Sequence, residues 1–166
     1  MEIRKAEIED KEQIVELLMQ MQGLHCKNRP DIFKEKTKKE TEKEFDETIE
    51  NKERNIIVVE NNDNKICGVC IFKIKEIKDH PNLKDAKILH IGKIGVDEKY
   101  RRKGIGKLMM KEMEKVAKKL DCDRIELNCW SFNEGAIEFY KSQNMKIQRL
   151  NFEMKGWLIW NILKNY

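Results

Sequence analysis

The chain has 166 residues, of which 40% are hydrophobic and 39% charged, and its formal net charge is only +4. This length fits one domain with one hydrophobic core, and nucleic-acid-binding proteins usually carry a larger or more concentrated basic excess. The apolar runs are far shorter than the roughly 18 residues that span a membrane, and the first residues lack the apolar core of a signal peptide. We therefore expect a cytoplasmic protein with neither nucleic acid nor membrane as a partner.

Hydrophobic periodicity predicts a mixed α/β fold in the first half of the chain. The expected elements are a strand over 1–6, a helix from Glu9 or Asp10 to Gly23, a helix within 34–54, and strands over 56–60 and 66–77. The second helix is dense in charges of both signs and carries a thin stripe of apolar and threonine side chains. This pattern is typical of a solvated helix that packs one narrow face.

The second half continues the alternation of strands and helices. The expected elements are a strand over 88–96, a helix over 104–120, a strand over 124–129, a helix over 133–142, a strand over 146–155 and an apolar tail over 156–166 that packs down. The first of these strands contains Gly92 and Gly95, and glycine inside a strand often marks a bulge or a close backbone approach. No internal repeat or linker interrupts the chain, so we expect a single domain over residues 1–166.

The chain contains five cysteines, an odd number without a secretion signal. This favours free thiols in a reducing compartment. Cys67 and Cys70 have the C-x-x-C spacing but lie inside a predicted strand, where side chains three positions apart point to opposite faces. We therefore expect buried structural thiols there and no metal site.

A basic turn with two glycines, Arg101 to Lys107, joins a predicted strand to a predicted helix. Helix N-termini expose unpaired N–H groups and a positive dipole end, and glycine lets an anion approach the backbone. The turn therefore predicts a phosphate-binding site. The dinucleotide motif needs a third glycine where Met109 stands, and the P-loop needs Ser or Thr where Leu108 stands, so both of these readings fail.

The motif R-x-x-G-x-G at 101–106 resembles the pyrophosphate-binding motif of the Gcn5-related N-acetyltransferase (GNAT) superfamily. The motif N-x-x-A-x-x-F-Y at 133–140 resembles the second signature of the same superfamily, in the same order and at a similar spacing. The family commonly has Leu-Gly-Phe after this helix, whereas this chain has Gln-Asn-Met at 143–145; Asn can adopt the left-handed conformation of a helix cap. The resemblance implies an α/β (α+β mixed) three-layer fold. Its central sheet would be mixed, mostly antiparallel and twisted, with six to seven strands, about four flanking helices and splayed fourth and fifth strands.

The resemblance also implies a reaction. We expect direct transfer of an acetyl group from the cosubstrate acetyl-coenzyme A to a primary amine of a small molecule, by a monomer or a homodimer without a metal. Two alternatives stay open: an acetyltransferase for protein N-termini or lysines, and an acetyl-coenzyme A-binding module without catalysis. The cofactor-binding residues that the resemblance implies are Ile94, Gly95, Val96, Arg101, Arg102, Lys103, Gly104, Ile105, Gly106, Lys107 and Asn133.

The reaction requires a base for the amine, an N–H donor for the developing oxyanion and an acid for the thiolate. Tyr140 matches the position of the family's usual acid, and backbone near 94–96 is the candidate N–H donor. His90 is the first candidate for the base because histidine titrates near neutral pH, and a water chain to Glu60 or Glu126 is the alternative. The residues expected near the acceptor amine, each of which could equally be structural, are His25, Asp31 and Phe33.

Overall fold

The computed structural model describes residues 1–154 and residue 156. Contacts divide the chain into two compact units, Met1–Phe132 and Asn133–Tyr166, and each is described by itself. The elements of the first unit are, in chain order, β1 (Glu2–Lys5), the 3-10 helix η1 (Ile8–Asp10), α1 (Lys11–Asn28), α2 (Lys38–Glu50), β2 (Arg54–Glu60), β3 (Ile66–Ile77), β4 (Ala86–Val96), the 3-10 helix η2 (Glu98–Tyr100), α3 (Ile105–Lys119) and β5 (Arg124–Leu127). The second unit contains α4 (Glu134–Ser142). The expected single domain over residues 1–166 stays a prediction.

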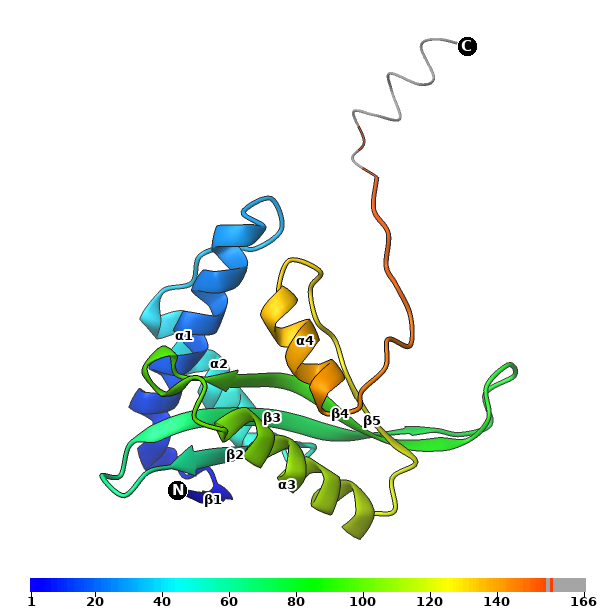
Figure 1. The fold of residues 1–166 in the computed structure, drawn as a ribbon, viewed down its shortest axis with the longest axis horizontal. Coiled ribbons are helices and arrows are strands. Elements are labelled where there is room, and N and C mark those ends of the chain that lie inside the picture. Colours follow the sequence, from blue (N-terminus) through cyan, green and yellow to red (C-terminus); the bar gives the residue numbers. More distant parts are fainter. Residues whose placement is uncertain (155, 157–166) are drawn as a thin grey trace. The chain divides into compact units, whose positions relative to one another are not determined.

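The first unit is built on a five-stranded sheet with the order β1-β2-β3-β4-β5 (Figure 1). Neighbouring strands from β1 to β4 are antiparallel, and β5 runs parallel to β4. The pairing of β4 with β5 runs only from Ile88 with Arg124 to Ile91 with Leu127. Within the described residues, positions 92–96 of β4 therefore have no partner strand on this side. The expected mixed, mostly antiparallel sheet with a separation between β4 and β5 is confirmed.

The sequence predicts a final strand over 146–155, and this prediction is wrong for the residues that the structure describes. The described part of it, residues 146–154, has no regular structure, and Leu150 and Phe152 are 68% and 86% exposed. Alternating apolar residues form a strand only where another strand supplies backbone hydrogen bonds, and no such pairing occurs among the described residues. The sheet in residues 1–154 therefore has five strands instead of six to seven. The expected packing of the tail over 157–166 lies outside the described residues.

Helices cover both faces of the sheet, which gives the three expected layers (Figure 1). Val69 of β3 belongs to the core that packs beneath α1 and α2. On the opposite face, a Cβ on Gly68 would lie 3.0 Å from Cγ2 of Ile105 in α3, and the Cys70 thiol contacts the Met113 sulfur at 3.7 Å. This alternation follows from the strand geometry, in which successive side chains point to opposite faces.

The two helices of the first face differ in how well the sequence predicts them. α1 continues through Gly23 to Asn28, so the expected end at Gly23 is wrong. A glycine inside a helix costs only about 1 kcal/mol relative to alanine, and the buried residues of the earlier turns, such as Leu17, anchor the helix. α2 has the expected narrow buried face, on which Thr41 is 2% and Phe45 1% exposed.

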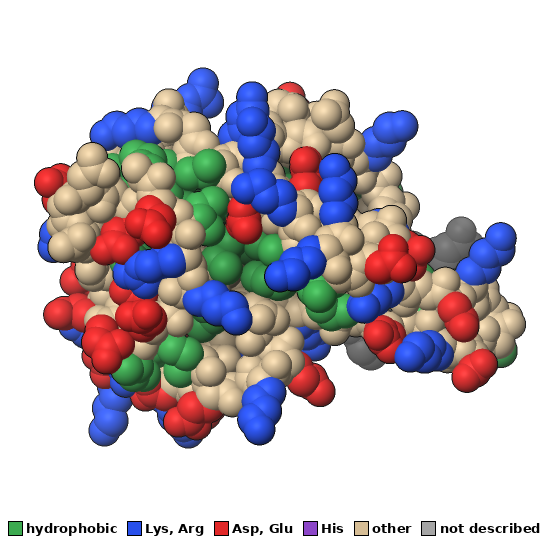
Figure 2. Space-filling view, turned by 90° about the horizontal axis from the view of Figure 1, so that it is seen from below, with side chains coloured by type: hydrophobic (Ala, Val, Ile, Leu, Met, Phe, Trp, Pro, Cys, Tyr) green, Lys and Arg blue, Asp and Glu red, His purple; other side chains and the backbone are tan. Residues whose placement is uncertain are grey.

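The surface carries charges of both signs. On the face shown in Figure 2, Lys and Arg side chains are interspersed with Asp and Glu side chains. Such a mixture produces no sustained field of one sign on that face. Among the helices of the described chain, none is both long enough and apolar enough to cross a bilayer.

Candidate active site

Residues 97–107 carry the chain from the end of β4 into α3. The Asp97 N–H donates a hydrogen bond to the Cys67 carbonyl at 3.0 Å, which holds the end of β4 against β3. In the following turn, Arg102 and Gly104 have positive φ angles of 63° and 81°. This left-handed conformation suits glycine and is costly for most other residues. The turn therefore depends on Gly104 for its shape.

α3 begins directly after Gly104 and has no side-chain cap. The Leu108 N–H donates to the Gly104 carbonyl at 3.0 Å. The N–H groups of residues 105–107 precede this first helical hydrogen bond and have no acceptor within the helix. A Cβ placed on Gly104 would meet nothing within 4 Å. The turn therefore combines free amides, the positive end of the helix dipole and space beside the backbone, which is what an anion requires.

Basic side chains surround this turn. The Arg101 guanidinium donates to Glu98 Oε1 at 3.3 Å, and the Lys103 ammonium lies 5.1 Å from the centroid of the Tyr100 ring. The exposed basic residues of the turn are Arg101, Arg102, Lys103 and Lys107. Their positive charge adds to that of the helix end, so the turn fits the diphosphate that the sequence motif predicts.

β4 contains a bulge at Gly92. The register with β3 shifts between Ile71 and Phe72, which leaves Gly92 as the extra residue. One extra residue reverses the alternation of side chains beyond it. His90 and Lys93, three positions apart, therefore point to the same face of the sheet, the face that α1 and α2 cover.

Gly95 marks a close approach of β4 to α1. A Cβ on Gly95 would lie 2.5 Å from the Met21 sulfur and 3.0 Å from Cδ2 of Leu17. Both readings of the strand glycines, a bulge and a close approach, are thus confirmed. The predicted cofactor-binding residues 94–96 lie on the stretch of β4 that has no partner strand on the β5 side within the described residues, directly before the glycine turn.

His90 belongs to a row of polar residues across four strands. Arg54 pairs with Lys73, Lys73 with His90, and His90 with Glu126. Directly paired residues point to the same face of a sheet. Glu126, one of the two carboxylates considered beside His90, is therefore its neighbour on β5, and its Oε1 accepts a hydrogen bond from Arg124 Nε at 2.6 Å.

A cavity of about 300 Å³ lies between α2 and three members of this row. Glu44 and Thr48 line it from α2, and Arg54, Lys73 and His90 line it from the sheet. Its wall therefore combines a carboxylate and a hydroxyl with several basic groups. This composition suits a small polar molecule better than an apolar one.

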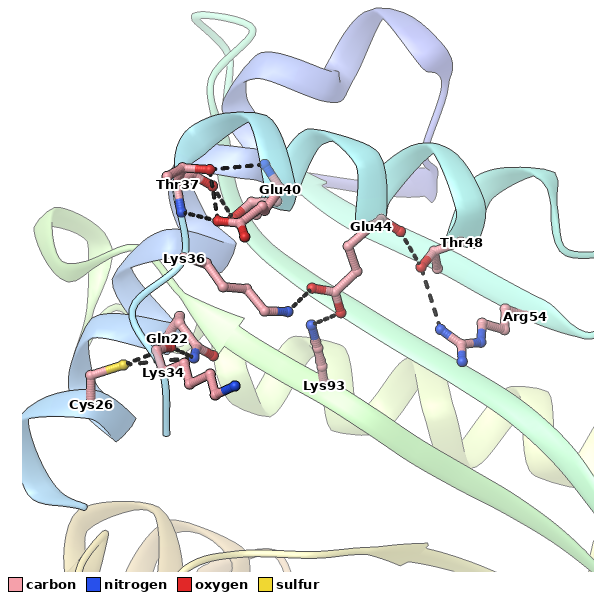
Figure 3. A network of polar contacts seen from close by, with 11 residues as sticks. Gln22, Cys26, Lys34, Lys36, Thr37, Glu40, Glu44, Thr48, Arg54 and Lys93 are labelled. Carbon is pink, nitrogen blue, oxygen red and sulfur yellow. Dashed lines mark hydrogen bonds and ion pairs between the residues drawn. The ribbon is translucent and has the colours of Figure 1, made fainter. Parts of the chain in front are cut away.

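Hydrogen bonds tie α2 to the sheet at this cavity (Figure 3). Glu44 accepts from Lys36 Nζ at 2.7 Å and, through its other oxygen, from Lys93 Nζ. Burial raises the pKa of Glu44, but the hydrogen bonds from Lys36 and Lys93 outweigh burial and leave this pKa below its usual value. Glu44 is therefore ionised and already paired at neutral pH. On the next turn of the helix, Thr48 Oγ1 accepts from Arg54 Nη1 at 3.4 Å.

Two predicted candidates are engaged elsewhere. Glu60 Oε2 accepts from Arg4 Nε at 2.6 Å, and Glu60 lies on β2, two strands away from β4. This position argues against Glu60 as the relay partner of His90. Asp31 forms a bidentate ion pair with Arg29, with both N···O distances at 2.9 Å. Its charge is therefore neutralised within its own loop, which favours a structural role over the attraction of an amine.

A closed ring of four aromatic side chains was missed by the sequence analysis. His25 stacks on Phe33 at 4.8 Å, Phe33 contacts Trp130 at 5.2 Å, Trp130 stacks on Phe132 at 6.1 Å, and Phe132 returns to His25 at 5.9 Å, all between ring centroids. Burial lowers the pKa of His25, and the charge of Lys93 lowers it further. The signal for this ring in the sequence is the W-x-F at 130–132, which begins three residues after the end of β5.

The second unit presents the second sequence motif on α4. The Asn133 side chain caps this helix by accepting from the Ala136 N–H at 3.3 Å. Tyr140 lies on the last turn, and its carbonyl accepts from the Met145 N–H at 3.1 Å. Asn144 has a φ of 63°, the left-handed conformation expected for it. The roles expected for Asn133 in cofactor binding and Tyr140 in proton transfer stay predictions.

The cysteines of the C-x-x-C sequence are buried in β3. Cys67 and Cys70 are both 0% exposed. Burial raises the pKa of Cys67, and it raises the pKa of Cys70 to about 12. Both side chains are therefore uncharged thiols at neutral pH, as expected for packing residues. Among the described residues, no group of three or more His, Cys, Asp or Glu side chains is arranged to hold a metal ion.

Comparison with known proteins identifies the family. The model of the acetyltransferase (GNAT) family matches residues 18–145. This match covers most of the chain, includes both sequence motifs and crosses the boundary between the two units. The chain therefore belongs to the GNAT acetyltransferase family, whose members use acetyl-coenzyme A as a cosubstrate.

Individual relatives agree with this assignment. An uncharacterized N-acetyltransferase of Methanocaldococcus jannaschii is 37% identical over 81 residues, which are 46% of this chain and 33% of that protein. The L-ornithine N5-acetyltransferase of Arabidopsis thaliana is 31% identical over 86 residues, 52% of this chain and 36% of that protein. The chain thus spans about a third of the length of these relatives.

Solved structures share the fold. A crystal structure of a variant of the BH1408 protein from Bacillus halodurans superposes with a TM-score of 0.89 at 28% identity, covering 93% of this chain and 99% of that one. A possible acetyltransferase of Clostridium difficile superposes with a TM-score of 0.72 at 20% identity, covering 93% and 95% of the two chains. At this identity the second similarity concerns the fold alone.

Proposed function

We propose that this protein transfers an acetyl group from acetyl-coenzyme A directly to a primary amine of a small molecule. The observation that carries the proposal is the N-terminus of α3, which has no side-chain cap, is surrounded by basic side chains, and follows a stretch of β4 without a partner strand within the described residues. An acyl carrier whose amide-containing arm is joined to a diphosphate matches both features. Its diphosphate suits the free amides, and its amide-containing arm suits an open strand edge.

The residues proposed to hold acetyl-coenzyme A come from these two segments. The backbone N–H groups of 105–107 and the basic side chains of the turn would bind the diphosphate, and residues 94–96 would pair with the arm. Asn133 is included on the strength of the family motif. When bound, acetyl-coenzyme A supplies an activated acetyl group as a thioester.

The chemistry that the chain itself would supply is proton transfer. His90 is proposed to take the proton from the amine, because it lines the cavity and has Glu126 as its neighbour on β5. A carboxylate beside a histidine orients the ring and stabilises its protonated form. Tyr140 is proposed to supply the proton that the leaving sulfur takes up. Each such transfer typically contributes about 10²–10⁴-fold to the rate.

The choice of a small molecule over a protein acceptor rests on the cavity. Its volume of about 300 Å³ is at the lower end of the range of small-molecule sites. The 31% identity to an L-ornithine N5-acetyltransferase adds support for a small amine, although that relative is about three times as long as the matched region.

The test is turnover of the full chain with acetyl-coenzyme A and a panel of amines. The panel contains amino acids with side-chain amines, polyamines, amino sugars and a peptide with a free N-terminus and a lysine. Thiol release gives the rate, and mass spectrometry identifies the acetylated product. We expect turnover on at least one small amine and little on the peptide. Turnover on the peptide alone would replace the proposal with protein acetylation, and calorimetric binding of acetyl-coenzyme A without any turnover would indicate a non-catalytic module.

A further inference from the structure

The charges around the cavity beneath α2 are not balanced. Arg54 and Lys73 face each other directly on β2 and β3 and both line the cavity. Two like charges directly opposite on neighbouring strands destabilise a sheet. Such a pair on the wall of a cavity therefore lowers the stability of the fold unless an anion lies between the two side chains.

No carboxylate of the described chain forms an ion pair with either residue. The Arg54 guanidinium donates to the Thr48 hydroxyl at 3.4 Å, which is a long hydrogen bond to an uncharged partner. Glu44 is the carboxylate that lines the cavity, and both of its oxygens are already occupied by Lys36 and Lys93 (Figure 3). The positive charges of Arg54 and Lys73 are therefore not neutralised by an ion pair within the described residues.

Two other arginines on the strands of this sheet form ion pairs. Arg4 on β1 binds the carboxylates of Asp10 and Glu60 at 2.7 and 2.6 Å. Arg124 on β5 binds Glu126 at 2.6 Å. Arg54 and Lys73, which form no such ion pair among the described residues, differ in this respect from Arg4 and Arg124.

We propose that Arg54 and Lys73 bind an anionic group, a carboxylate or a phosphate, of the acceptor amine. This inference rests on the proposed acetyl transfer and names the class of acceptor: a primary amine that carries a negative charge at its other end. Arg and Lys bind carboxylate and phosphate through charge-assisted hydrogen bonds. The cavity places this anion site and His90 on one wall, so one small molecule can reach both.

The register limits the length of the acceptor. Arg54, Lys73 and His90 occupy consecutive strands, and neighbouring strands lie about 4.8 Å apart, so at most roughly 10 Å separates the backbone of Arg54 from that of His90. A substrate whose amine and anion are several bonds apart fits this span. An α-amino group beside its own carboxylate is too close to that carboxylate to reach His90 while the anion is bound at Arg54.

The experiment compares matched amines that differ only in the anion. L-ornithine is paired with 1,4-diaminobutane for the carboxylate arm, and glucosamine 6-phosphate with glucosamine for the phosphate arm. We expect the wild-type chain to show at least about 10-fold higher kcat/KM for the anionic member of one pair, the size typical for one charge-assisted hydrogen bond. The arm that shows the difference identifies the anion.

Variants then assign the effect to the two residues. In Arg54→Gln and Lys73→Gln, we expect KM for the amine that carries the anion to rise about 10-fold or more, while KM for the matched amine without the anion does not rise and KM for acetyl-coenzyme A stays unchanged. Lys52→Gln is the matched control, because Lys52 is exposed, precedes β2 and does not line the cavity. Since each variant removes a like-charge contact, its Tm should equal or exceed that of the wild type, and inorganic phosphate should inhibit the wild type more strongly than either variant.

The outcomes separate this inference from the proposed function. Turnover of both members of each pair with equal kcat/KM would overturn the anion site and leave acetyl transfer intact. An equal rise in KM in the variants for amines with and without the anion would also overturn it, because the residues would then act on the shape of the cavity. Absence of turnover with every amine would instead overturn the proposed function, and the inference with it.

Discussion

α2 and α3 are the second and third α-helices of the first unit, and their first turns treat the free backbone amides differently. At α2 the Thr37 hydroxyl accepts from the Glu40 N–H, and the Glu40 carboxylate accepts from the Thr37 N–H, so two side chains of the chain itself close the turn. At α3 the corresponding position is Gly104, which has no side chain and makes no capping bond. Side chains of the chain itself therefore cap the N-terminus of α2, whereas the N-terminus of α3 has no side-chain cap.

This contrast separates stability from binding. A side-chain cap contributes to the folding free energy because it satisfies amides in the folded chain. An uncapped end forgoes that contribution and keeps its amides and dipole available for a ligand. Substitutions at α3 should therefore change ligand binding, and substitutions at α2 should change stability.

The largest expected effect is that of Gly104→Glu on the binding of acetyl-coenzyme A. A side chain at a φ of 81° is strained, and the carboxylate would lie where the diphosphate is expected. Two like charges about 4 Å apart near a protein surface repel by roughly 4 kcal/mol before screening by salt. We expect calorimetry to show at least about a 100-fold loss of affinity.

Two further variants make this result specific. Gly104→Ala carries the strain without the charge, so it should bind more tightly than Gly104→Glu. Gly23→Glu places the same charge on an exposed helical glycine of α1, where a Cβ meets nothing within 4 Å, and should bind like the wild type. If Gly104→Glu kept wild-type affinity, the amides of α3 would not be the diphosphate site.

The next largest effect is that of a substitution at Tyr140 on the rate of acetyl transfer. Tyr140→Phe removes the proposed acid and keeps the ring, so kcat should fall at least about 10-fold, with acetyl-coenzyme A affinity unchanged. Phe139, the neighbouring ring on α4, contacts Tyr140 at 5.4 Å between centroids, and Phe139→Leu serves as a control for packing of the helix. An unchanged kcat in Tyr140→Phe would remove this residue from proton transfer.

The uncapped helix end at which we propose diphosphate binding could be predicted from the sequence because its determinants are contiguous. The turn at 101–107 carries its glycines, basic residues and helix start within a few positions, so the sequence predicts the free helix end directly. Gly92 and Gly95 likewise predicted a bulge and a close approach, and the structure has both. Local geometry of this kind depends on backbone conformations that the residue type itself restricts.

The proposed acceptor site was harder to predict because its residues meet only through strand register. Arg54, Lys73 and His90 come from three strands, and nothing in their local sequence indicates that they lie in one row. The bulge at Gly92 was expected, but its consequence, His90 and Lys93 on one face, depends on the pairing with β3. The alternation of apolar and polar residues over 146–155 led to a wrong prediction of a strand for the same reason, since such alternation does not specify a partner strand.

A moderate effect on stability is expected at the capped helix. Thr37→Ala removes the hydroxyl that accepts from the Glu40 N–H, and loss of such a cap typically costs about 1 kcal/mol. Chemical denaturation should show this decrease in the free energy of unfolding, and calorimetry should show unchanged binding of acetyl-coenzyme A. Thr37→Ser, which keeps the hydroxyl, should recover most of the stability. A change in binding in Thr37→Ala would mean that the two helix ends are coupled.

The smallest effect is a pH dependence of the same cap. Hydrogen bonds from the Thr37 N–H and then from its hydroxyl lower the pKa of Glu40 in the folded chain. A carboxylate whose pKa is lower in the folded than in the unfolded state stabilises the fold above its unfolded pKa, about 4.3 for Glu, and this stabilisation is lost as the pH falls through the folded value. The wild type should therefore be more stable than Glu40→Gln at neutral pH, and the difference should shrink as the pH falls below about 4. Urea denaturation of both chains across this range measures it, with Glu35→Gln, at an exposed position before α2, as the control for a general loss of negative charge. A difference that stays constant with pH would show that the Glu40 carboxylate contributes by its shape and not by its charge.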